Sequence, residues 1–171
     1  DEEKKVLDKL RELATRLSRR VEEAHRESEK IAEEIRRRAE KVLRESRKTV
    51  EEIKRSPDDR KDVRRVVKED EDRSREVVKD LERLLKELED RSRKLEEELR
   101  RIMKKIEEEV RRAGVDERIK DDVRRMKKEL EDLIEENRRR VEKVKEDIRR
   151  LIRELEARNE DVDRELRRKE D

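Results

Sequence analysis

Apolar residues recur along this chain on an 18-residue cycle, and this spacing constrains the fold more than any other feature. In the first third of the chain the cycle marks one line of apolar positions: Val6, Leu10, Leu13, Leu17, Val21, Ala24, Ile31, Ile35, Ala39, Val42, Val50 and Ile53. Because eighteen residues complete five turns of an ideal α-helix, such a line runs along the helix without drifting to either side. The spacing therefore predicts long helices with little supercoiling.

Two short turns interrupt the pattern. At the only proline, Ser56 can cap a helix that has Pro57 at its first position, with Asp59 reaching back as in a capping box. At the only glycine, Gly114 suits the left-handed residue that ends a helix, and Asp116 suits the cap of the next helix. The apolar stripe changes phase at both turns, which predicts separate helices over about 2–55, 57–113 and 116–170.

The second and third helices carry stripes of the same kind. The second stripe includes Val63, Val67, Val77, Leu81, Leu85, Leu88, Leu95, Leu99, Met103, Ile106 and Val110, and the third includes Ile119, Val123, Met126, Leu130, Val141, Val144, Ile148, Leu155, Val162 and Leu166. Each stripe can bury one helical face. Short connections favour antiparallel neighbours. We therefore predict an all-α fold: an extended, antiparallel, up-down-up three-helix bundle of three near-straight helices, each of about 54 residues, in one domain over 1–171.

The composition excludes several classes of function. Charged residues make up 64% of the chain and aromatic residues are absent, which alone would suit a disordered polyelectrolyte; the helical period argues against that. Lys and Arg number 56 and Asp and Glu 54, and acids stand three or four positions from bases, as in Glu33 and Arg37. Such pairs support a helix, whereas nucleic-acid binding needs surplus cations. We expect no nucleic-acid partner.

Neither a redox role nor a membrane role is indicated by the sequence. There is no cysteine, so disulfides and thiolate metal sites are excluded. No apolar run approaches the ~18 residues that span a bilayer, and no signal-peptide core is present. We expect a soluble chain with no membrane partner and no targeting signal.

Polar residues also lie on the apolar stripes. Val6 opposite Val110 gives residue numbers that add to 116 for the first and second helices, and Val63 opposite Leu166 gives 229 for the second and third. With these sums the polar residues gather in two layers, each with residues from all three helices. The first polar layer comprises His25, Ser28, Ser92 and Asn137, and the second polar layer comprises Ser46, Thr49, Asp70, Ser74 and Asn159.

Clustering gives these polar residues a structural role. A buried polar group without a partner costs ~1–3 kcal/mol, so grouped donors and acceptors are expected to satisfy one another and to fix helix pairing and register. Alternatively, the Ser and Thr hydroxyls bond the backbone of their own helix. Two environments are open to Asp70: burial among donors, or the edge of the core, where it reaches water or an arginine.

Taken together, these residues resemble a family: de novo designed, parametrically generated helical bundles with buried hydrogen-bond networks. The resemblance covers the whole chain and rests on the 18-residue seam, the equal helix lengths, the Glu-, Lys-, Arg- and Asp-rich surface, the SPDD and AGVD turns and the two polar layers. Asp70 in a core layer and the flanking His25 depart from the plainest members. The resemblance implies no catalysis and no natural ligand, and a role as a scaffold or as a designed association partner.

Other chemistry is weakly supported. Glu22-x-x-His25 has the spacing of a di-metal motif, but such a site needs the motif twice and this is the only histidine. Ser28 or Ser92 could approach His25, yet the sequence offers no oxyanion donors and no Gly-rich turn. We therefore predict no enzyme, no metal and no cofactor. The leading hypothesis is a monomeric scaffold that requires no partner. The alternative is an interaction module in which an apolar groove accepts a partner helix or a second copy, supported by the flanking apolar residues Leu7, Leu43, Val66, Val78, Leu84, Ile102, Leu133, Ile134, Leu151 and Ile152.

Overall fold

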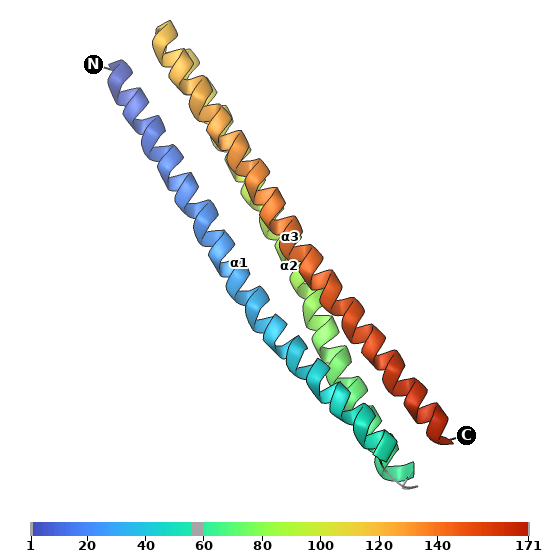
Figure 1. The fold of residues 1–171 in the computed structure, drawn as a ribbon. Coiled ribbons are helices and arrows are strands. Elements are labelled where there is room, and N and C mark those ends of the chain that lie inside the picture. The colour runs from blue at the N-terminus through green and yellow to red at the C-terminus, as the bar shows by residue number, and fades with distance from the viewer. Residues whose placement is uncertain (1, 56–59, 171) are drawn as a thin grey trace. The chain divides into compact units, whose positions relative to one another are not determined.

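Three α-helices make up the described part of the chain, which covers residues 2–55 and 60–170 of a computed structural model (Figure 1). The helices are α1 (Glu2–Arg55), α2 (Arg60–Ala113) and α3 (Glu117–Glu170), each of 54 residues. They pack against one another, and no strand occurs within the described ranges. The predicted all-α three-helix fold is confirmed. The expected capping turn at 56–59 lies outside the described residues.

Local sequence accounts for the helices and for the second turn. Glu, Lys and Arg, which cover the exposed positions, are strong helix formers. Gly114 has φ of 57°, the left-handed conformation that ends a helix. Asp116 Oδ1 accepts a hydrogen bond from the backbone N–H of Ile119 at 3.2 Å, so Asp116 caps α3 as predicted.

The chain divides into two compact units, and all three helices contribute to both. The first unit comprises Asp1–Ser28 and Leu88–Lys143, and the second comprises Glu29–Glu87 and Val144–Asp171. Each unit therefore contains one segment of α1, one of α2 and one of α3. That the whole chain forms one domain stays a prediction.

The core of the first unit is built from all three helices and from the second turn. Its buried residues are Leu10, Leu17, Val21, Leu95, Leu99, Ile106, Val110, Val115, Ile119, Val123, Met126, Leu130 and Ile134. Burying each large aliphatic side chain contributes ~1.5–3 kcal/mol. Ile134 in this unit and Leu84 in the second unit are buried, although both were expected to flank the core.

Interhelical ion pairs show that neighbouring helices keep one antiparallel register. Residue numbers add to 118 in three α1–α2 ion pairs and to 234 in three α2–α3 ion pairs. The α1–α2 pairs are Arg20–Glu98, Arg38–Asp80 and Glu45–Arg73, and the α2–α3 pairs are Arg64–Glu170, Glu96–Arg138 and Glu107–Lys127. Constant sums require antiparallel neighbours, and the same sums hold in both units.

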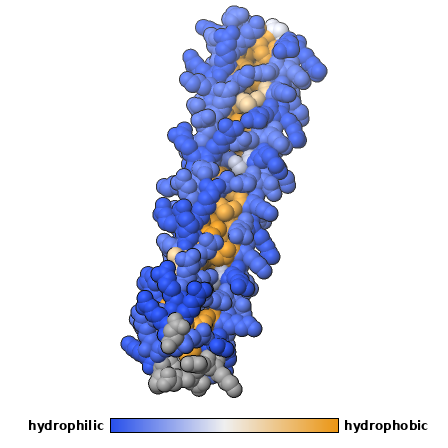
Figure 2. All heavy atoms as spheres, turned by 90° about the vertical axis from the view of Figure 1, so that its right-hand side faces the viewer, coloured by the Kyte–Doolittle hydropathy of each residue, from blue (hydrophilic) through white to orange (hydrophobic). Residues whose placement is uncertain are grey.

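Charged side chains cover most of the surface. Figure 2 shows apolar residues as a narrow band between charged ones on the face in view. Within the described ranges no large hydrophobic side chain is exposed. None of the three described helices contains a segment apolar enough to span a bilayer.

Candidate functional site

The first polar layer lies within the first unit, where the structure joins two of its four residues. Asn137 of α3 is 4% exposed, and its Nδ2 donates a hydrogen bond of 3.4 Å to Ser92 Oγ of α2. Their numbers add to the predicted 229. Ser28 is buried and His25 half-buried on α1, but the bond between Ser92 and Asn137 includes neither of them.

Ion pairs lie near this layer. Arg138 binds Glu96 with both arms of its guanidinium, Nε to Oε1 at 2.7 Å and Nη2 to Oε2 at 3.0 Å. Arg140 Nη1 donates to Glu22 Oε1 at 2.8 Å and thereby lowers the pKa of Glu22, which His25 also lowers to a smaller extent. These contacts connect α3 to α2 and to α1. Glu22 therefore faces a base of α3.

The second polar layer lies within the second unit and is centred on Asp70 of α2. Asp70 is 0% exposed, and Ser46 Oγ of α1 donates to its Oδ1 at 2.8 Å. These two residue numbers add to the predicted 116. Of the two environments considered for Asp70, contact with water is excluded by this burial, although Arg73 Nη2 of the same helix reaches within 3.9 Å of Oδ1.

Thr49 does not join the network. Its side chain is buried, but its Oγ1 donates to the backbone oxygen of Glu45 at 3.0 Å, one turn earlier in α1. For this residue the expected interhelical role is wrong and the alternative of bonding its own helix holds. A threonine in a helix can reach the carbonyl oxygen four residues back.

Mutual satisfaction of the second polar layer is incomplete. Asp70 Oδ2, Ser74 Oγ and Asn159 Oδ1 are buried, and none of these atoms has a hydrogen-bond partner in the described part of the chain. Ser74 is 1% exposed, and Asn159 is half-buried. The expectation that grouped donors and acceptors would all pair is therefore wrong for these three atoms. Two of these atoms are acceptor oxygens, and the third belongs to a hydroxyl group that can both donate and accept.

Burial shifts the proton equilibrium of Asp70. Burial raises the pKa of Asp70, the hydrogen bond from Ser46 and the charge of Arg73 oppose the rise, and Glu45 adds to it. Desolvation is the largest contribution, because removing a carboxylate from water disfavours its charged form. The interior of the second unit therefore favours protonated Asp70.

One interaction of this region was missed by the sequence reasoning. The carboxyl group of Asp163 on α3 acts on that of Glu71 on α2 and, together with burial, raises the pKa of Glu71 from 4.5 to about 7. The two numbers add to 234, as in the acid–base pairs between the same helices. The sum of 234 is known only from the ion pairs of the structure, so the sequence alone offered no signal that these two acids face each other.

No metal-binding group of three or more His, Cys, Asp or Glu side chains occurs in the ranges the structure describes. The side chains of the polar layers can donate and accept hydrogen bonds, and the carboxyl group of Asp70 can bind a proton. Comparison of the chain with known protein families, with characterised proteins and with solved structures finds no match.

Proposed function

We propose that this chain is a designed structural scaffold whose polar layers specify which helices pair and in which register. It is neither an enzyme nor a carrier of a cofactor in this proposal. The supporting observation is two interhelical hydrogen bonds, the buried one from Ser46 to Asp70 and the partly buried one from Asn137 to Ser92, which occur at the residue sums derived from the apolar seams. One bond joins α1 to α2 in the second unit, and the other joins α3 to α2 in the first.

The physical argument concerns alternatives to the native packing. An apolar seam of Leu, Val and Ile tolerates sliding by a turn, because one aliphatic contact replaces another. A slide would separate Ser46 from Asp70 and leave a carboxyl group buried without a donor, which costs more than a lost neutral hydrogen bond. The polar layers thus disfavour slipped arrangements more than they stabilise the native one.

Replacing the buried acid with an apolar residue tests this role. Asp70→Leu is expected to leave the free energy of unfolding unchanged or to raise it, and to broaden the register between α1 and α2. Spin labels at the exposed positions 40 and 79 report this register by their distance distribution, since the chain has no cysteine of its own. Glu69→Leu, at an exposed position of α2, is the control. One narrow distance in D70L, as in the unsubstituted chain, would contradict the specificity role.

The second candidate is association through an apolar groove. A docking face would be expected to present large apolar side chains, and the described residues expose none. We therefore propose a monomer that requires no partner chain and binds neither nucleic acid nor membranes. Size-exclusion chromatography with light scattering at micromolar concentration is expected to give the mass of one chain, and a stable dimer would favour the second candidate.

A further inference from the structure

Three buried polar atoms of the second polar layer have no hydrogen-bond partner among the residues that the structure describes. They are Asp70 Oδ2 and Ser74 Oγ on α2 and Asn159 Oδ1 on α3. Asp70 is 0% exposed and Ser74 is 1% exposed, so bulk water does not reach these side chains. A buried polar atom is costly to leave unpaired. A partner for the three atoms is therefore expected inside the layer.

The side chains that carry these atoms lie at one level of the second unit. Asp70 and Ser74 are four residues apart on α2, and residues at this spacing are neighbours on one helical face, with Cβ atoms about 5–6 Å apart. The register that α2 and α3 keep in both units places Asn159 opposite Asp70, at residue numbers that add to 229. This sum brings side chains within direct reach, as the 3.4 Å hydrogen bond from Asn137 to Ser92 shows.

Two other hydroxyl groups of the layer already have acceptors. Ser46 Oγ donates to Asp70 Oδ1 at 2.8 Å, and Thr49 Oγ1 donates to the backbone oxygen of Glu45 at 3.0 Å. A hydroxyl group has one proton to donate. Neither group can therefore also serve Asp70 Oδ2 or Asn159 Oδ1.

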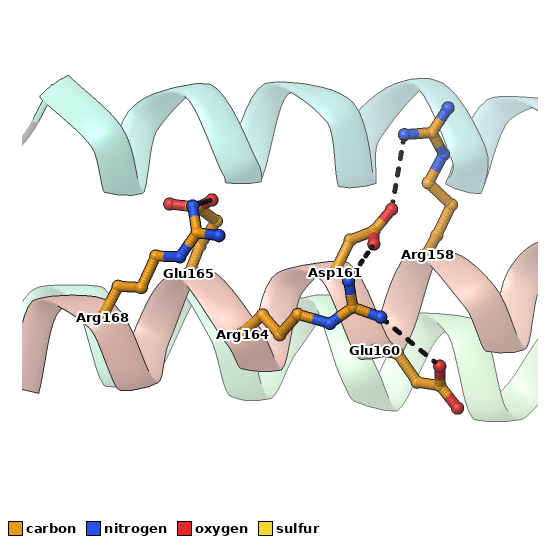
Figure 3. A network of polar contacts seen from close by, with 6 residues as sticks. All are labelled: Arg158, Glu160, Asp161, Arg164, Glu165 and Arg168. Carbon is orange, nitrogen blue, oxygen red and sulfur yellow. Dashed lines mark hydrogen bonds and ion pairs between the residues drawn. The ribbon is translucent and has the colours of Figure 1, made fainter.

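The charged neighbours of Asn159 on α3 are engaged with one another. In Figure 3, Asp161 lies between Arg158 and Arg164, at 3.9 and 4.0 Å. Arg164 also approaches Glu160 at 3.9 Å. Arg158, which precedes Asn159 in the sequence, is thus directed to an acid of its own helix, and it is not a partner of Asn159 Oδ1.

The unpaired atoms match the hydrogen-bonding groups of one water molecule. Asp70 Oδ2 and Asn159 Oδ1 are acceptors, and the Ser74 hydroxyl can donate. One water can donate to both acceptors and accept from Ser74, and buried waters typically make about three hydrogen bonds. A water also suits either charge state of Asp70, because it can turn and accept from a protonated carboxyl group.

Small side chains give this layer less side-chain volume than an apolar layer has. Ser46 and Ser74 are buried on seams that elsewhere carry mainly Leu, Ile and Val. A serine has two heavy atoms fewer than a leucine, and a water occupies about 30 Å³ in the liquid. The size of the layer therefore favours a ligand as small as water.

We propose that the second polar layer binds one water molecule, held between α2 and α3 by Asp70 Oδ2, Ser74 Oγ and Asn159 Oδ1. This site goes beyond the scaffold function, since it does not depend on whether Asp70 sets the register. The water gives all three atoms a partner and connects α2 to α3. Holding a water in place costs entropy, so a side-chain donor introduced into the layer can replace it with a gain in stability.

Oxygen-17 magnetic relaxation dispersion tests the site by counting the waters that exchange slowly with the bulk. Ser74→Val puts methyl groups in place of the hydroxyl, and Asn159→Leu removes the facing acceptor. Each variant is expected to lose one slowly exchanging water per chain. Thr49→Val is the matched control, because it removes a buried hydroxyl of the same layer whose proton already goes to Glu45. Its water count should equal that of the unsubstituted chain.

A crystal structure of the unsubstituted chain tests the contacts without any substitution. The expected result is a water about 2.5–3.0 Å from Asp70 Oδ2, Ser74 Oγ and Asn159 Oδ1. A direct hydrogen bond from Ser74 to Asp70 Oδ2 with no water between them would overturn the proposal, as would an ion closer than about 2.4 Å to these oxygens. Equal water counts in S74V, N159L and the unsubstituted chain would overturn it too. None of these results bears on the register measured in D70L, so the two proposals fail separately.

Discussion

Replacing Asp70 with Asn is the most direct measure of what a buried carboxylate does in this core. The substitution keeps the shape of the side chain and removes its charge. Oδ1 can still accept the hydrogen bond of Ser46, which is 2.8 Å long in the structure. The new Nδ2 supplies a donor to a layer in which Ser74 Oγ and Asn159 Oδ1 have no partner among the described residues.

The expected magnitude follows from these contacts. Each buried polar atom left without a partner costs ~1–3 kcal/mol, and the new amide can relieve one acceptor. Removing the charge also removes the desolvation that raises the pKa of Asp70. Because the raised pKa means that the folded state prefers the protonated acid, the contribution of Asp70 to stability is lost as the pH rises. Asp70→Asn should therefore stabilise the chain by ~1–3 kcal/mol at pH 8 and by less at pH 5.

Urea unfolding followed by circular dichroism at 222 nm measures this difference at the two pH values. Asp72→Asn, at an exposed position of the same helix, is the matched control and should change stability little. The reasoning is refuted if D70N is less stable than the unsubstituted chain at pH 8 while D72N is unaffected. That result would mean that Ser46 and Arg73 more than offset the burial of the charge.

Two further substitutions examine the core and the second turn. Leu99→Ala removes a side chain that is 0% exposed and should lower the free energy of unfolding by ~3–5 kcal/mol. Leu133→Ala, at a half-buried position, should lower it clearly less. Equal losses in urea unfolding would contradict the burial pattern. Asp116→Ala removes the acceptor of the Ile119 N–H and should lower the free energy of unfolding by ~0.5–2 kcal/mol. Asp116→Asn keeps an acceptor and should change this free energy little. An unchanged free energy of unfolding in D116A would show that the cap does not stabilise α3.

Much of the fold could be predicted because helical period and turn chemistry are local properties. Gly114 and Asp116 mark the second turn by residue type alone, and the structure shows the left-handed backbone and the cap that they predict. The helix pairing followed from matching the ends of the apolar seams. The resulting sums correctly placed Ser46 opposite Asp70 and Ser92 opposite Asn137.

The errors arise where two local solutions compete. Thr49 lies on the buried face, as expected, but its hydroxyl donates to a carbonyl oxygen of its own helix. The rotamer of the side chain selects this partner, and the spacing of residues in the sequence does not indicate the rotamer. Leu84 and Ile134 have Leu85 and Leu133 as neighbours, and a stripe assigned at 100° per residue does not decide which member of an adjacent apolar pair lies deeper.

Glu71 and Asp163 show a different limit. Both are charged residues beside the seam, where an acid is ordinary, and each belongs to a helix with many i,i+3 and i,i+4 pairs. Whether these two residues face each other depends on the register between α2 and α3. Small errors in the helical phase assigned to each residue add up along the chain, so this register is hard to predict from the sequence. Only after the sum of 234 is known from the other ion pairs does the like-charge contact stand out.

The two polar layers differ in the chemistry that satisfies them, and this difference determines how each unit responds to pH. In the first unit the hydrogen bond from Asn137 to Ser92 joins an amide to a hydroxyl, and neither group titrates. The nearby acids Glu22 and Glu96 form ion pairs with arginines. In the second unit the central group is a carboxyl, and a carboxyl pair lies beside it. Because burial raises the pKa of Asp70, the contribution of this carboxyl group to the stability of the second unit is expected to be lost as the pH rises.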